Sequence, residues 1–315
     1  MKNFKIGTKL LLSILVLTIV SCSKDEVIAE KRIEVKNLMT INVDGVKYRS
    51  INENFAGNEN CGNLHVSTAY YEKNNIDFRL TISLSENGQL NYVRYGENKL
   101  PIQGVTVMKQ FFTPNFNPLR TFNISEFSYN SATRDLSFRF EGTVFFEGDN
   151  SKVRNLSGKI DMKSFRTIEC GIVKTGISFI SPNFTIYDTN SNRTRFANNT
   201  QRHRYFLNNG HIIDINVEQD FWDLQLGEIL FTQSSTQNKV SIIKQLDNII
   251  ANQTASMNDH QWLNYGTEGK IIIEKKEIIN GTKKISGTIN LNMFDNGQLV
   301  RSLNGIKFST GSFND

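Results

Sequence analysis

The sequence lacks the residue clusters that carry most enzyme chemistry. It has only 4 His in 315 residues, and no His-x-His, His-Glu-x-x-His or Cys-His cluster, so the usual spacing of a zinc site is missing. There is no Gly-x-Ser-x-Gly elbow, no phosphate-binding loop and no dinucleotide fingerprint. We therefore expect no catalytic residue, no metal and no cofactor.

The chain also has little excess charge and no long apolar run. Its formal net charge is +5, but residues 1–22 carry three Lys and no acid, which leaves +2 for the remainder. A value so close to neutral argues against a nucleic-acid partner. A mean hydropathy of −0.36 excludes a polytopic membrane protein, and 22 Phe argue against general disorder.

The N-terminus has the features of a secretory signal peptide. Lys2, Lys5 and Lys9 precede an apolar run of 11 residues, Leu10 to Val20. This run is about half of the ~20 residues that a membrane-spanning helix needs, so residues 1–22 are interpreted as a signal. Residues 23–37 are charged and show no periodicity, which predicts a flexible tether.

The signal peptide ends in a motif that indicates which type of signal peptide it is. Ile19-Val20-Ser21-Cys22 resembles the lipobox of bacterial lipoproteins, and Ser23-Lys24-Asp25-Glu26 is similar to the export tag of surface lipoproteins from Bacteroidetes-type bacteria. The resemblance implies that Cys22 is lipidated, with diacylglycerol on its sulfur and an acyl chain on its new amine. It also implies a lipid-anchored protein of the outer membrane that faces the cell exterior. A periplasm-facing position and a simple cleaved signal are the alternatives.

The rest of the chain predicts strands. Period-2 alternation dominates, and Asp44-Gly45 is a strong hairpin signal because both positions tolerate positive φ. Asn280-Gly281 and Asp295-Asn296-Gly297 provide similar turns. One segment, 240–256, differs, since its apolar residues recur at a spacing of 3.6 and favour an amphipathic helix. The fold class is therefore all-β, as two tandem β-sandwich or open-barrel-like domains with one amphipathic helix in the second.

The two halves end in similar sequences. Leu136-Ser137 in the first half matches Ile285-Ser286 in the second, and Gly158 matches Gly305. This similarity favours a duplicated β domain, 38–167 and 168–315, although convergent hairpin chemistry is an alternative. Together with Asp44-Gly45, the pattern resembles that of a family of small β-rich Bacteroidetes lipoproteins. This resemblance implies no particular enzymatic reaction.

The two cysteines that remain after Cys22 form an even pair in an oxidising compartment. Cys61 and Cys170 are therefore predicted to form a disulfide that closes 109 residues. Two buried free thiols are the alternative.

Aromatic side chains are the main positive indication of function. Flat rings stack on sugars, so the candidate ligand-binding residues are Phe221, Trp222, Trp262 and Tyr265. A basic run, Arg193 to Arg204, is a candidate for an anionic partner. The favoured function is a non-enzymatic module that binds a glycan or a protein. The alternatives are an accessory subunit of an outer-membrane uptake, secretion or motility complex, and a glycan hydrolase that uses acids among Glu218, Asp220 and Asp223.

Overall fold

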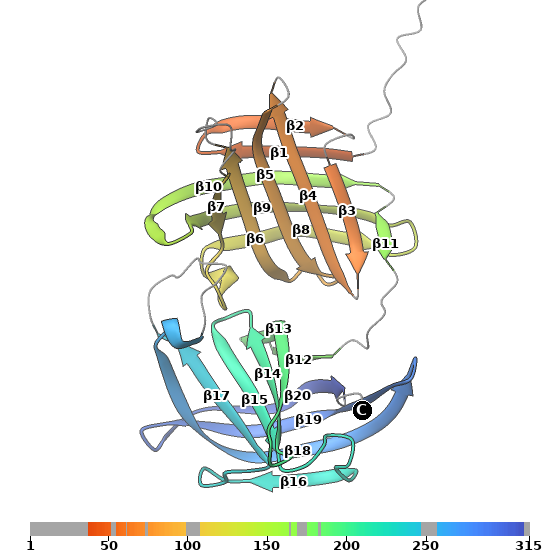
Figure 1. Cartoon of the computed structure of the whole chain (residues 1–315), viewed down its shortest axis with the longest axis vertical. Coiled ribbons are helices and arrows are strands. Elements are labelled where there is room, and N and C mark those ends of the chain that lie inside the picture. Colours follow the sequence, from red (N-terminus) through yellow and green to blue (C-terminus); the bar gives the residue numbers. More distant parts are fainter. Residues whose placement is uncertain are drawn as a thin grey trace, which may run out of the picture. The chain divides into compact units, whose positions relative to one another are not determined.

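A computed structural model describes most of the chain after the N-terminal tether (Figure 1). The described residues are 37–51, 55–60, 62–72, 75–98, 108–163, 165–168, 175–181, 184–246 and 257–311. They form two hydrogen-bonded sheets, the first ending at Ile168 and the second beginning at Gly176. The all-β prediction is confirmed.

The first sheet contains eleven strands. In sheet order β11-β3-β4-β5-β6-β7-β9-β10-β1-β2, with β8 paired to β9, it begins and ends with short strands. The bounds are β1 (Asn37–Val43), β2 (Val46–Ile51), β3 (Phe55–Asn60), β4 (Asn63–Glu72), β5 (Asn75–Ser85), β6 (Leu90–Asn98), β7 (Met108–Phe112), β8 (Phe122–Asn130), β9 (Asp135–Phe146), β10 (Asp149–Met162) and β11 (Arg166–Ile168).

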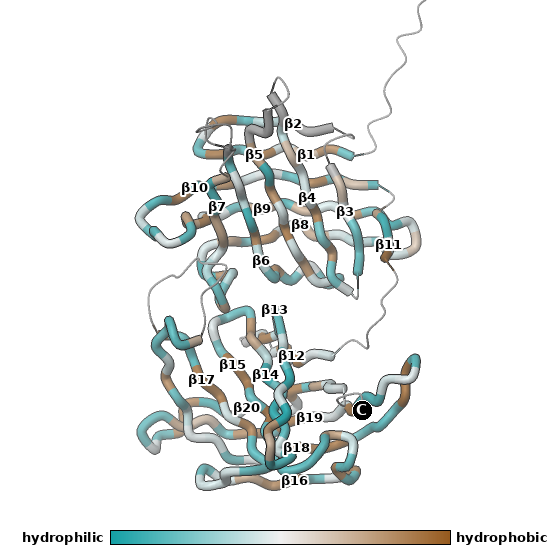
Figure 2. Tube along the Cα trace, in the orientation of Figure 1, coloured by the Kyte–Doolittle hydropathy of each residue, from teal (hydrophilic) through white to brown (hydrophobic). Residues whose placement is uncertain are grey.

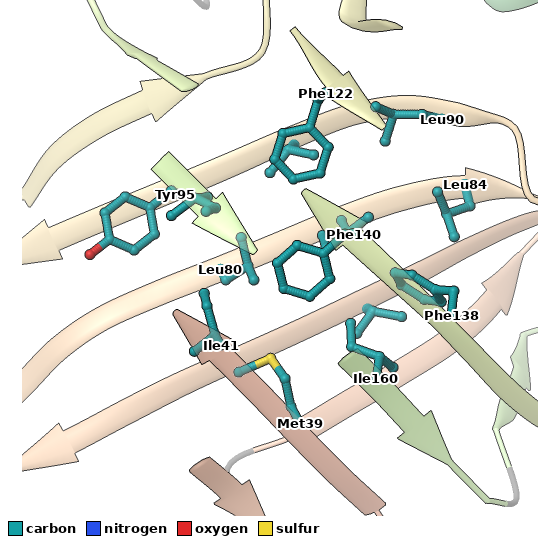
Figure 3. Close-up of a cluster of buried hydrophobic side chains, with 14 of the residues drawn as sticks. Met39, Ile41, Leu80, Leu84, Leu90, Tyr95, Phe122, Phe138, Phe140 and Ile160 are labelled. Carbon is teal, nitrogen blue, oxygen red and sulfur yellow. The ribbon is translucent and has the colours of Figure 1, made fainter. Parts of the chain in front are cut away.

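This sheet folds over on itself and encloses its own core. Figure 1 shows β3–β6 crossing β8–β10, β1 and β2 at a steep angle. Apolar side chains of the two halves meet between them, among them Met39 and Phe140 from one half and Leu80 from the other (Figure 3). The far edges also approach each other, because the Tyr48 ring on β2 lies 5.1 Å from the Tyr70 ring on β4. One face of most of these strands is thus buried and the other faces outward, whereas all three residues of β11 are exposed.

The second sheet closes into a barrel of eight strands, with β16 added beside β18. Its order is β18-β17-β15-β14-β13-β12-β20-β19, and β19 pairs with β18. The bounds are β12 (Gly176–Ser181), β13 (Phe184–Arg195), β14 (Gln201–Leu207), β15 (His211–Val217), β16 (Gly227–Phe231), β17 (Lys239–Gln245), β18 (Trp262–Ile279), β19 (Thr282–Asp295) and β20 (Gln298–Gly311).

Closure corrects the prediction of a β-sandwich or an open-barrel-like domain for this half. The length of β18, 18 residues, is the physical reason. Residues Trp262–Tyr265 pair with β17, and Gly266–Ile279 pair with β19, so one strand joins both ends of the sheet. A closed sheet has no unpaired edge among those eight strands.

The predicted amphipathic helix over 240–256 is wrong where the structure describes it. Residues Lys239–Gln245 form strand β17, which pairs with β15 and β18. Val240 and Ile242 point into the barrel at a spacing of two, and this spacing fits a strand. Residues 247–256 lie outside the described part. Among described residues, no helix is both long and apolar enough to cross a membrane.

The predicted hairpin turns are confirmed. Asp44-Gly45, Asn280-Gly281 and Asn296-Gly297 each place two consecutive residues at positive φ, between 47° and 92°. These angles match the type I′ turn, whose twist suits two-residue hairpins. Figure 2 shows the alternation of hydrophilic and hydrophobic residues along the strands that these turns connect. Whether each sheet is a domain that folds alone stays a prediction.

Candidate functional site

The four predicted ligand-binding aromatics do not form one surface. Phe221 is 1% exposed and belongs to the barrel core. Trp222 is half-buried, with the Nζ atoms of Lys276 and Lys283 at 5.6 and 5.7 Å from its ring centre. Trp262 and Tyr265 lie near the start of β18, whereas Lys276, which contacts Trp222, lies 14 positions further along that strand.

The individual contacts of Trp262 and Tyr265 are structural. The Trp262 indole nitrogen donates a hydrogen bond to the Met257 carbonyl at 2.8 Å. The Tyr265 ring stacks on His211, with centres 6.2 Å apart, and burial raises the pKa of its hydroxyl. Both rings are partly exposed.

The three predicted cysteine sites, Cys22, Cys61 and Cys170, lie outside the described residues. The basic run does not form one charged surface, because Arg204 is paired with Asp214 at 2.5 Å and Arg193 donates to the Gly311 carbonyl at 2.7 Å.

One of the acidic candidates for hydrolysis, Asp220, has structural contacts. The Asp220 carboxylate accepts hydrogen bonds from the Gln201 side chain at 2.7 Å and from the Trp222 backbone at 2.8 Å, and it holds the loop that follows β15. Among the residues that the structure describes, no group of three or more His, Cys, Asp or Glu is arranged to hold a metal ion.

A buried histidine lies in the barrel. His203 is 1% exposed, and its Nδ1 lies 2.6 Å from the Thr310 hydroxyl and 2.8 Å from the Tyr205 hydroxyl. Burial, with a smaller contribution from the charge of Arg193, lowers the pKa of His203 from 6.5 to about 3. The imidazole is therefore neutral in the folded protein at physiological pH.

We expect His203 to make the fold less stable in mild acid. Between pH 6.5 and about 3 the unfolded chain binds a proton at this position and the folded chain does not, so stability falls as the pH falls. At about 1.4 kcal/mol per pH unit, the loss between pH 7 and pH 5 is about 2 kcal/mol. Urea unfolding at both pH values measures it. His203→Gln should remove this share of the dependence and leave the share of His211, whose pKa burial lowers to about 4. An equal slope in both proteins would contradict the assignment.

A candidate site lies on the outward face of the first sheet. Two adjoining hollows, each of about 610 Å³, share the residues Asn42, Glu141 and Ser157. One hollow extends toward Lys47 and Lys159 on β2 and β10. The other extends toward the Asp44-Gly45 turn and the segment before β8. We call the two hollows together the outer groove.

Strand alternation explains why polar side chains line this groove. On β10, Leu156 and Ile160 are buried in the core, and Ser157 and Lys159 between them point outward. On β9, Phe138 and Phe140 are buried, whereas Arg139 and Glu141 are exposed. The burial of the apolar residues in the core therefore determines which polar side chains of these strands face the groove.

The register aligns these outward side chains in two rows across five strands. Each row takes one residue from β2, β1, β10, β9 and β8 in turn. The cationic row is Arg49, Thr40, Lys159, Arg139 and Ser125, and the mixed row is Lys47, Asn42, Ser157, Glu141 and Asn123.

Side-chain amides at the other end of the groove are held in fixed orientations. The Asn42 carbonyl oxygen accepts from the Gly45 backbone N–H at 2.6 Å. The Asn155 carbonyl oxygen accepts from the Thr143 hydroxyl at 2.9 Å, and the Thr121 hydroxyl donates to the Thr143 carbonyl at 2.9 Å. These contacts use the amide oxygens and leave the NH₂ groups of Asn42 and Asn155 as donors for a ligand.

The groove thus offers cations, amides and hydroxyls along an extended surface. These groups supply hydrogen bonds and positive charge, which are means of binding. Sequence reasoning missed the site because its residues come from five strands and share no local motif. The sequence signal that could have indicated the groove is the alternation in these strands, where each polar residue between two buried apolar residues points outward. No family model, curated protein or solved structure matches the chain.

Proposed function

We propose that this protein is a non-enzymatic, lipid-anchored module of the outer bacterial surface that binds a glycan in the outer groove. The observation that carries the binding role is the pair of hollows that share Asn42, Glu141 and Ser157. The lipid anchor and the surface position rest on the resemblance of Ile19-Val20-Ser21-Cys22 and the following residues to exported lipoproteins.

The chemistry of the groove favours a glycan over a compact apolar ligand. Side-chain amides and hydroxyls, such as Asn155, Thr143 and Ser157, match the donors and acceptors of sugar hydroxyl groups. Two hollows in a row suit an extended oligomer better than a single small molecule. Small-molecule pockets are clefts that bury most of their ligand, whereas both hollows are open to solvent on the outward face of the sheet.

Binding of soluble protein, residues 23–315, to a panel of neutral and charged oligosaccharides tests the proposal. Ser157→Tyr places a ring where the two hollows meet and should weaken binding at least tenfold, which is about 1.4 kcal/mol. Ser67→Tyr is the matched control, because Ser67 is also half-buried on the first sheet and lines neither hollow.

Two results would contradict the proposal. One is the absence of binding to every glycan in the panel at millimolar concentration. The other is equal binding by the Ser157→Tyr variant and the unmodified protein, which would place any glycan site elsewhere. Circular dichroism and urea unfolding of both variants exclude a simple loss of fold.

A further inference from the structure

We infer that the ligand of the outer groove is an acidic glycan whose anionic groups bind the cationic row. This inference rests on the proposed function and specifies its ligand. The first observation is a pair of like charges. Lys159 on β10 lies directly opposite Arg139 on β9, and both side chains are exposed on the same face.

Such a pair is unfavourable unless an anion lies between the two cations. Residues directly opposite in an antiparallel pair have Cα atoms about 5 Å apart, and like charges at this distance destabilise the sheet. Arg49 is a third cation in the same row. Thr40 lies between it and Lys159, so the backbones of Arg49 and Lys159 are two strand spacings, or about 10 Å, apart. A linear ligand with repeated negative charge matches this arrangement.

The cations of this hollow are largely uncompensated. Within the described part of the chain, no carboxylate lies within ion-pair distance of Lys47, Arg49 or Lys159. Arg139 is paired with Glu126 at 2.7 Å, but the two side chains are 55% and 65% exposed. An ion pair as exposed as this contributes little to stability, so a ligand carboxylate or sulfate can replace it.

Glu126 itself is held in an unusual conformation. Its φ is 50°, in the left-handed region, and it lies in an irregularity of β8 between Ser125 and Ser128. This region is unfavourable for a non-glycine residue, and residues held there concentrate at functional sites. The irregularity brings a carboxylate to Arg139, where it acts as an internal counterion that competes with the ligand.

The groove favours an acidic glycan over a nucleic acid. Bases require exposed aromatic rings on which to stack. The rings among the lining residues are Tyr48, Phe122 and Phe140, and the two Phe are each 2% exposed. Tyr48 is half-buried and packs edge-on against Tyr70 and Phe78. Apart from the Glu141 carboxylate, the remaining polar lining groups are amides, hydroxyls and cations, which hydrogen-bond hydroxyls and neutralise anions and so suit sugars that carry carboxylate or sulfate groups.

Binding to polygalacturonate and heparin oligosaccharides, with neutral dextran oligosaccharides for comparison, tests the inference. Lys159→Gln and Arg139→Gln should each weaken binding of the acidic oligosaccharides about fivefold to tenfold. Glu126→Gln should strengthen it about twofold to fivefold, since the competing carboxylate is removed. Lys152→Gln is the matched control, because Lys152 lies on β10, is exposed, and lines neither hollow.

The outcomes separate this inference from the proposed function. If dextran binds as tightly as the acidic oligosaccharides and the Lys159 and Arg139 variants bind normally, the acidic ligand is wrong but glycan binding stands. If no oligosaccharide of either type binds, both proposals fail. Tighter binding of single-stranded DNA than of either acidic oligosaccharide overturns the glycan assignment. A binding order of acidic over neutral, with the expected variant effects, supports it.

Discussion

Replacing Cys22 with Ala is expected to release the protein from the membrane fraction of the bacteria that produce it. Position 22 ends the sequence Ile19-Val20-Ser21-Cys22, and the predicted anchor consists of acyl chains on that one residue. Each buried methylene of an acyl chain contributes ~0.8 kcal/mol to membrane binding, so several chains together anchor a protein durably. Cell fractionation and incorporation of labelled palmitate measure the effect.

A second cysteine provides the control for this experiment. Cys61→Ala leaves the lipobox unchanged, so that variant should keep both the palmitate label and the membrane position. The prediction fails if the Cys22→Ala protein stays equally membrane-bound or if the unmodified protein takes up no label. Protease treatment of intact cells then distinguishes a surface position from a periplasmic one.

The parts of the fold that depend on local chemistry were predictable from sequence. Asp44-Gly45 requires two residues at positive φ and accordingly forms a type I′ turn between β1 and β2. Asn280-Gly281 and Asn296-Gly297 behave in the same way around β19. A turn of this kind fixes the register of its two strands, so the hairpins follow directly from a few residues.

The segment after residue 239 shows where local patterns are insufficient. Ile242 and Ile243 fit a helical face together with later residues, and they also fit a buried strand. The deciding contacts are nonlocal, since Ile242 pairs with Ile213 on one side and with Tyr265 on the other. Barrel closure depends on the same long-range pairing and could not be deduced from residues near in sequence.

The candidate site was missed for a related reason. Thr40, Lys159 and Arg139 are adjacent in the sheet but span 119 positions of the chain. A run of basic residues near position 200 was visible in the sequence, but its Arg204 is neutralised by Asp214. Likewise, the ring of Phe221 is of a type that stacks on sugars, but this side chain is buried in the core of the barrel. Residue type alone does not tell a surface ring from a packed one.

Reduction of the purified protein is expected to lower its free energy of unfolding by roughly 4–5 kcal/mol, through loss of a Cys61–Cys170 disulfide. Both cysteines lie outside the described residues, but the segments that precede them are paired. Strand β11 runs parallel to β3, with Ile168 opposite Asn60. Cys61 follows Asn60 directly in sequence, and Cys170 follows Ile168 by two positions.

The size of the expected effect follows from the length of the closed loop. A bond between these cysteines closes 109 residues, and the chain-entropy account gives about 4–5 kcal/mol for a loop of this length. Mass spectrometry after alkylation of soluble 23–315, with and without reductant, detects the bond, and urea unfolding measures its contribution. Cys61→Ser and Cys170→Ser should each lower stability to that of the reduced protein, and the double variant should lower it no further. Two alkylated thiols in the unreduced protein would exclude the disulfide, and additive losses in the two single variants would show that each sulfur contributes separately through packing.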